Sequence, residues 1–179
     1  MVILIGGSSH VGKTLLAHTL VERLHWSCTS LDHLKMAFIR TGMTDLTVED
    51  DLEMRYFLWP FAAEMIKTAV ENDQDMIIEG CYIPGEWRDS FEPSYLDDIR
   101  CVFIVMSERY IRDNFDSICS CANVIEARLE DRPDMERLIM CSRNFKADCE
   151  KYGIDCIEID SVYDADELTA EILKICGEA

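Results

Sequence analysis

Basic residues are scarce in this chain. It has 17 Lys and Arg against 35 Asp and Glu, which gives a formal net charge of −18 at pH 7. An acidic surface repels nucleic acids and anionic membranes, so we expect neither as a partner. Any phosphate group must be held by a local positive site against the field of the whole molecule. That favours a small ligand in a cleft over a polyanion on the surface.

Long apolar runs are also lacking. None approaches the roughly 20 residues that span a membrane. The opening apolar run is short and lacks the basic start of a signal peptide, so we expect a cytoplasmic protein. With 179 residues, 49% of them hydrophobic, and no long linker or internal repeat, the sequence predicts one domain over 1–179, as a monomer or a homodimer.

The cysteines lack the spacing of a metal or disulfide framework. There are nine, an odd number, and no C-x-x-C pair occurs. We therefore expect reduced thiols that mostly serve as small buried side chains. Cys119 and Cys121 are the one close pair in the sequence, and a metal or redox role for them is the open alternative.

One short segment carries the strongest functional signal. It matches the pattern G-x-x-x-x-G-K-[ST] of phosphate-binding loops (P-loops). The matching residues, which we predict to bind the nucleotide, are Gly7, Ser8, Ser9, His10, Val11, Gly12, Lys13 and Thr14. Glycines let successive N–H groups point at one anion, and the following helix adds its positive end. Lys13 is expected to reach the β- and γ-phosphates, and the Thr14 hydroxyl to ligate Mg²⁺.

The surroundings of this segment support the match. An apolar run at 1–5 predicts a buried parallel strand, and residues 13–24 have helical spacing of leucines. Strand, glycine loop and helix are the order that a P-loop requires. We therefore expect ATP and Mg²⁺ as cofactors; the alternative is a chance match in an ordinary turn.

Strand-like and helix-like segments alternate along the chain. Candidate strands are 2–5, 27–31, 76–79, 101–106 and 155–159, and candidate helices are 13–24, 33–41, 50–72, 107–120, 135–152 and 164–175. This alternation predicts an α/β fold: a central parallel sheet of about five strands with helices on both faces, in three layers, as in P-loop NTPases.

Two regions depart from the alternation. Residues 50–72 contain Pro60, which is expected to break or kink a helix, and an aromatic cluster that forms either core or a substrate pocket. Residues 120–134 are polar and form either a mobile lid or a solvated connector. Arg128 and Arg132 lie in this candidate lid, where guanidinium groups could close over a phosphoryl transition state, and we predict that they are catalytic.

Carboxylates follow two of the candidate strands. Ligands of open α/β sheets bind at the carboxyl ends of the strands. Glu79 ends a strand, and we predict that it helps to hold Mg²⁺ or binds substrate; the alternative is an exposed acid. Asp32 follows another strand and could orient an acceptor hydroxyl and take its proton; the alternative is an N-cap for the next helix. Arg40, which ends that helix, is a candidate for binding an acidic group of the acceptor.

These segments resemble the small P-loop kinases of the nucleoside-monophosphate kinase and shikimate kinase type. The stretch 5–14 also looks like the start of chloramphenicol phosphotransferases and 2-phosphoglycerate kinases. In those families an Asp after the second strand faces the acceptor hydroxyl, and Asp32 matches that position. Residues 77–80, with Glu79, are similar to the acidic strand end of 2-phosphoglycerate kinase and zeta-toxin-like proteins.

The resemblance implies a kinase that transfers the γ-phosphate of ATP to a hydroxyl of a small molecule, with Lys13 and Asp32 as catalytic residues. One alternative is a nucleoside or nucleotide kinase with a phosphate acceptor, which needs no such base. A second is a nucleotide-binding switch without phosphotransfer.

Overall fold

The computed structural model describes residues 1–121 and 134–178. Five parallel strands form one sheet in the order β2-β3-β1-β4-β5. Their bounds are β1 Val2–Gly7, β2 Ser27–Ser30, β3 Met76–Glu79, β4 Ile99–Met106 and β5 Asp155–Ile159. The predicted α/β fold with a five-stranded parallel sheet is confirmed.

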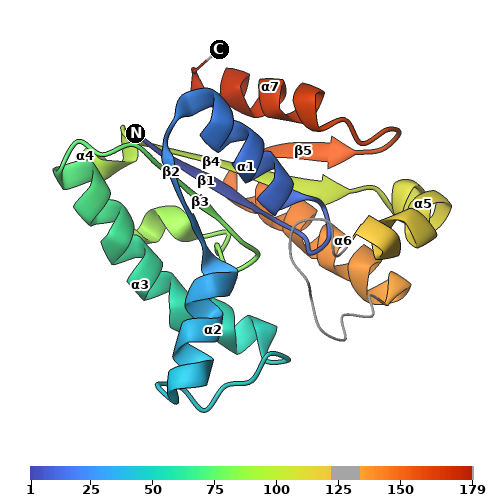
Figure 1. Ribbon diagram of the computed structural model, residues 1–179, viewed down its shortest axis with the longest axis horizontal. Helices are drawn as coiled ribbons and strands as arrows, with labels where there is room; N and C mark the ends of the chain where they lie inside the picture. The colour runs from blue at the N-terminus through green and yellow to red at the C-terminus, as the bar shows by residue number, and fades with distance from the viewer. Residues whose placement is uncertain (122–133, 179) are drawn as a thin grey trace.

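Helices cover both faces of this sheet (Figure 1). They are α1 Lys13–Leu24, α2 Leu31–Thr41, α3 Asp51–Glu71, α4 Pro93–Leu96, α5 Glu108–Cys121, α6 Met135–Tyr152 and α7 Ala165–Cys176, with a 3-10 helix, η1, at Trp87–Ser90. Helices α1 and α7 pack on one face, and α3 and most of α6 pack on the other. The result is the three-layer arrangement that the sequence predicts.

The central strand β1 is buried on both faces, which explains its uninterrupted apolar sequence. Val2 and Leu4 join the core under α3 and α6, whereas Ile3 and Ile5 join the core under α1 and α7. Successive side chains of a strand point to opposite faces, so one run of four residues supplies both cores. The carboxyl end of β1 leads directly into the glycine loop.

Helix α3 is not broken at Pro60, one of the two effects expected of this proline. It continues from Asp51 to Glu71 as one helix with Pro60 inside. Pro60 is exposed, so the carbonyl of Tyr56 that its missing N–H leaves unpaired lies on the solvent side of the helix. The nearby Trp59 is 6% exposed and donates its indole N–H to Ser90 Oγ at 2.8 Å, so it belongs to the core.

Several boundaries, among them that between β2 and α2, differ from the sequence-based expectation. Strand β2 ends at Ser30, because α2 already begins at Leu31. The two short helices η1 and α4 were not predicted; both lie between β3 and β4. Among the described residues, no helix is both long and apolar enough to cross a membrane.

Candidate active site

The phosphate-binding loop connects β1 to α1 at the carboxyl edge of the sheet. Its backbone turns through positive φ angles at Gly7, His10 and Gly12, as a loop that curls around an anion requires. Gly12 is the N-cap of α1, with no side-chain cap and no acidic residue in the first turn. By contrast, Asp134 and Asp164 cap α6 and α7 with their carboxylates. The start of α1 is thus left open for an external anion.

Gly12 cannot be replaced without moving its neighbours. Its φ is 82°, and a Cβ atom placed on it would lie 2.3 Å from the hydroxyl oxygen of Tyr163. That hydroxyl donates to the Gly12 carbonyl at 3.5 Å. The segment after β5 therefore packs directly on the loop, which requires a residue without a side chain at this position.

Lys13 lies folded against the loop that precedes it. Its ammonium donates to the Ser8 carbonyl at 2.6 Å, and the residue is 8% exposed. The Ser8 hydroxyl accepts a hydrogen bond from Ser142 of α6 at 2.9 Å, and Ser142 in turn accepts from the Met106 N–H. The loop is thus anchored to both β4 and α6, and the Lys13 ammonium is held where phosphates would enter.

The remaining loop residues occupy the environments that the motif requires. The Ser9 hydroxyl and His10 Nδ1 lie 2.8 Å apart, and both residues are partly exposed at the loop. Val11 is 1% exposed and packs in the core shared with α1. The loop therefore combines a fixed apolar side with a polar side that faces outward.

Thr14 and Glu79 come together as the sequence predicts. The Thr14 hydroxyl donates to Glu79 Oε1 at 3.5 Å. Glu79 ends β3, pairs in register with Ile5 of β1 and is 1% exposed. A hydroxyl beside a carboxylate, next to a phosphate loop, is suited to binding Mg²⁺, which prefers oxygen ligands. Of the described residues, this pair is the one we expect to hold Mg²⁺, directly or through water.

Asp32 is not the N-cap of α2, so that alternative is wrong. Ser30 occupies the N-cap position, and Asp32 lies within the first helical turn. Leu31 packs closely on Gly80, where an added Cβ would lie 2.8 Å from Leu31 Cβ. This contact holds Asp32 beside the segment that follows Glu79. Asp32 makes no side-chain hydrogen bond or ion pair with any other residue in 1–121 or 134–178.

A buried lysine lies one turn beyond Asp32. Lys35 is 7% exposed and donates to Tyr82 Oη at 2.6 Å, the Val48 carbonyl at 3.0 Å and Asp51 Oδ1 at 3.3 Å. The Tyr82 hydroxyl also donates to Asp51 Oδ1, at 3.4 Å. Burial, with the nearby Asp32 and Asp51 carboxylates, raises the pKa of Tyr82, so its hydroxyl stays a donor. We call these three residues, Lys35, Asp51 and Tyr82, the Lys35 network.

The Lys35 network extends to α6. Arg137 Nη2 contacts Asp51 Oδ2 at 2.9 Å, so Asp51 bridges a cation of α2 and a cation of α6. Burial raises the pKa of the Cys81 thiol to about 11, and its electrostatic neighbours include Lys13, Asp32 and Asp51. The network therefore lies close to Asp32 and Lys13.

We expect Lys35→Met to lower the free energy of unfolding by about 1–3 kcal/mol, because it leaves Tyr82 and Asp51 without the buried ammonium that joins them. Lys67→Met is the matched control: Lys67 pairs with Glu64 on the surface of α3, and such pairs contribute little. Urea denaturation of both variants checks this. Equal stabilities for the two variants would show that the Lys35 network is not stabilising.

The arginines singled out in the sequence lie in different places relative to the candidate site. Arg40 is exposed in the last turn of α2, at the end of the helix that lies away from the sheet, so the structure does not bring it to the loop (Figure 1). Arg128 and Arg132 lie outside the described residues, as does most of the predicted lid. Arg109 pairs with Asp160, and Arg143 with Glu108. Arg137 is the arginine that the structure places closest to the Lys35 network.

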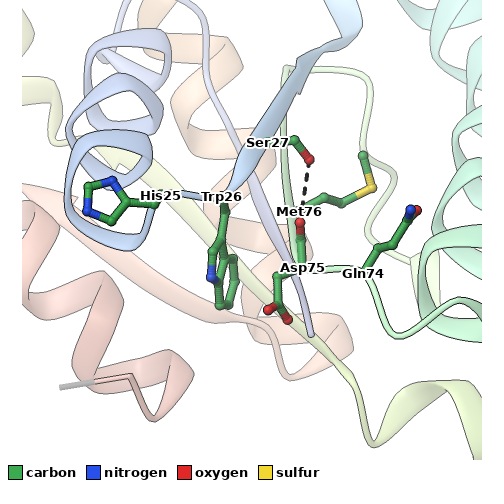
Figure 2. A pocket seen from close by; sticks show the side chains of 6 residues that line it. All are labelled: His25, Trp26, Ser27, Gln74, Asp75 and Met76. Atoms are coloured by element: carbon green, nitrogen blue, oxygen red, sulfur yellow. Dashed lines mark hydrogen bonds between the residues drawn. The ribbon is translucent and has the colours of Figure 1, made fainter.

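A separate pocket of about 360 Å³ lies at the opposite edge of the sheet. Figure 2 shows its lining, in which the Trp26 ring and the Asp75 carboxylate lie side by side. Ser27 and Met76 begin β2 and β3, so this pocket lies at the amino ends of the strands. The Asp75 carboxylate already pairs with the N-terminal ammonium at 2.7 Å. This pocket is thus remote from the phosphate loop and forms no part of the candidate active site.

The solved structures that share this fold include three kinases. A gluconokinase from Sinorhizobium meliloti 1021 matches with a TM-score of 0.56 at 15% identity, over 98% of this chain and 90% of that one. A shikimate kinase from Aquifex aeolicus vf5 matches with a TM-score of 0.54 at 17% identity, over 99% and 96%. A sugar kinase from Janibacter sp. HTCC2649 matches with a TM-score of 0.59 at 15% identity, over 99% and 95%.

No family model and no curated protein sequence matches the chain. At identities of 15–17%, the structural likeness establishes the fold and leaves the chemistry to be argued from the site. The chain therefore has the fold of small-molecule P-loop kinases over nearly its whole length.

Proposed function

We propose that this protein is an ATP-dependent phosphotransferase that transfers the γ-phosphate to a hydroxyl group of a small molecule. The gluconokinase, shikimate kinase and sugar kinase folds support phosphotransfer in general. The arrangement at the carboxyl edge of the sheet supports the finer assignment. It combines a phosphate loop, a hydroxyl beside a buried acid, and a carboxylate with no partner among the described residues.

The loop residues have the properties that binding of a nucleotide requires. The start of α1 has neither a side-chain cap nor an acid in its first turn, so its N–H groups are available to phosphate oxygens. Lys13 stabilises negative charge on the transferred group once it leaves the Ser8 carbonyl. Thr14 and Glu79 would hold Mg²⁺, which neutralises phosphate charge when bound.

Asp32 is the single observation that carries the choice of a hydroxyl acceptor. Its carboxylate lies at the carboxyl edge of the sheet, next to the segment that follows Glu79, and it caps no helix. A carboxylate there can orient an acceptor hydroxyl and take its proton. It would repel an acceptor phosphate, so it disfavours the alternative of a nucleotide kinase.

The Lys35 network gives the acceptor side a fixed polar surface. The Asp51 carboxylate is held by Lys35, Tyr82 and Arg137. Because each of these groups has a partner, the network keeps one geometry and can discriminate between acceptors by hydrogen bonding. The acceptor is therefore expected to be polar and small enough to lie between α2 and α6.

Product analysis across a panel of acceptors tests this proposal. The purified protein is incubated with ATP, Mg²⁺ and, in separate reactions, polyols, hydroxy acids, hydroxylated antibiotics and nucleoside monophosphates. We expect ADP release that depends on a hydroxylated acceptor, and a phosphate monoester as the product by phosphorus NMR. A diphosphate formed from a nucleoside monophosphate would replace this proposal with a nucleotide kinase. Tight ATP binding without turnover on any acceptor would replace it with a switch.

A further inference from the structure

Two thiols lie next to each other between α6 and β5. Cys149 is in the last turn of α6 and is 4% exposed, whereas Cys156 is the second residue of β5 and is exposed. Both are free, and each thiol affects the pKa of the other. They lie at the amino ends of the strands, away from the phosphate loop, so the proposed function makes no use of them.

An ion pair independently fixes how these two elements face each other. Lys146 Nζ contacts Glu158 Oε2 at 2.6 Å, so this face of β5 meets α6. Ile157, between Cys156 and Glu158, points to the opposite core. Cys149 lies three residues after Lys146 in α6, and Cys156 lies two residues before Glu158 in β5. Since i and i+3 share a helix face and i and i+2 share a strand face, Cys149 and Cys156 lie on the sides of α6 and β5 that face each other.

The two thiols are expected to differ in reactivity, with one acting as the nucleophile and the other following it. The interaction with Cys149 lowers the pKa of the Cys156 thiol, although desolvation and the nearby Glu158 act in the opposite direction. The same interaction, together with burial, raises the pKa of Cys149. The thiolate is the nucleophilic form of cysteine, so the exposed Cys156 reacts first and the buried Cys149 second.

We propose that Cys149 and Cys156 form a reversible intramolecular disulfide when the protein meets a hydroperoxide. The Cys156 thiolate attacks the O–O bond of hydrogen peroxide, which gives a sulfenic acid and hydroxide. The Cys149 sulfur then attacks the sulfenic sulfur, the S–S bond forms, and water leaves. In sum, two thiols and one peroxide give one disulfide and two waters; a dithiol reverses the step.

The bond would join the end of α6 to β5 across the turn at Gly153. Gly153 ends α6, and its N–H donates to the Cys149 carbonyl. The same helix carries Ser142, which bonds to Ser8 of the phosphate loop. Oxidation therefore acts on the helix that anchors the loop, although the disulfide itself does not depend on the proposed activity.

Thiol mapping of the full chain tests the proposal. The protein is treated with hydrogen peroxide, alkylated, digested and analysed by mass spectrometry, without reduction. We expect one peptide pair joined through Cys149 and Cys156, loss of two of the nine thiols, and their return with dithiothreitol. Cys28 should stay reduced, because desolvation of its thiol and the nearby Glu79 raise its pKa to about 11.

Three variants separate the pair from a general sensitivity to oxidation. Cys156→Ser, at an exposed position, should lose the cross-link, whereas Cys28→Ser should still lose two thiols. Cys149→Ser should stop at a sulfenic acid on Cys156 that dimedone traps. Because Cys149 is buried, circular dichroism first confirms that this variant folds. A disulfide to the neighbouring Cys101, or oxidation of Cys28 as fast as Cys156, would overturn the proposal.

Discussion

Lys13→Ala is expected to abolish phosphotransfer and to weaken ATP binding without unfolding the protein. Its ammonium now contacts the Ser8 carbonyl, and no other described residue supplies a cation inside the loop. Losing one preorganised donor in a transition state typically costs about 3–4 kcal/mol, or on the order of 10²–10³ in rate. Calorimetric titration with ATP and a coupled ADP assay measure the two effects.

The control for this variant is Lys67→Ala, which removes a lysine from the surface of α3, far from the loop. It should leave ATP affinity and turnover unchanged. Circular dichroism establishes that both variants fold. Wild-type ATP affinity and turnover in Lys13→Ala would show that residues 7–14 are not a nucleotide site, whatever their sequence.

Asp32→Asn is expected to keep ATP binding and to lower kcat, because an amide cannot accept the proton of the acceptor hydroxyl. General-base catalysis typically contributes about 10²–10⁴-fold, although a loose phosphoryl transition state draws less from the base. Since Asp32 does not cap α2, the stability should change by no more than the roughly 0.3–1 kcal/mol of its interaction with the helix dipole.

The matched control is Asp73→Asn, an exposed residue after α3 with a φ of 52°, a conformation that asparagine tolerates well. Its kcat should equal that of the wild type. A kcat for Asp32→Asn within about threefold of the wild type would rule out the base, and the phosphate acceptor would then be preferred. Steady-state kinetics on the acceptor found in the panel decides the matter.

The regular elements of the fold could be predicted from the sequence because their signals are local. Helices α1 and α6 and strands β3 and β5 have the predicted bounds, since each has a clear apolar period and a turn at both ends. Helix α3 also lies within one residue of its predicted bounds, but the sequence could not settle whether Pro60 breaks it, because that depends on whether the freed carbonyl reaches solvent. The short helices η1 and α4 have too few residues to show a period.

The parts of the candidate site that lie in one short segment of the chain could be predicted from the sequence. Residues 7–14 and Glu79 could be found because a loop motif and a strand end are local features, and the structure brings them together through Thr14. The Lys35 network was not found, because its members come from three separate parts of the chain. One signal was present: Lys35 follows Leu31 by four residues on the apolar face of α2, where a charge needs a buried partner.

The central position of β1 has a consequence for the order in which the protein folds. Val2 pairs with Met76 on one side and with Ile99 on the other, and Ser8 N–H donates to the Ile104 carbonyl. The phosphate loop is therefore translated before β3 and β4 and cannot be held in place until β4 has left the ribosome. Pairings between such distant residues fold slowly, so the loop reaches its final shape only after about a hundred further residues of chain have been made.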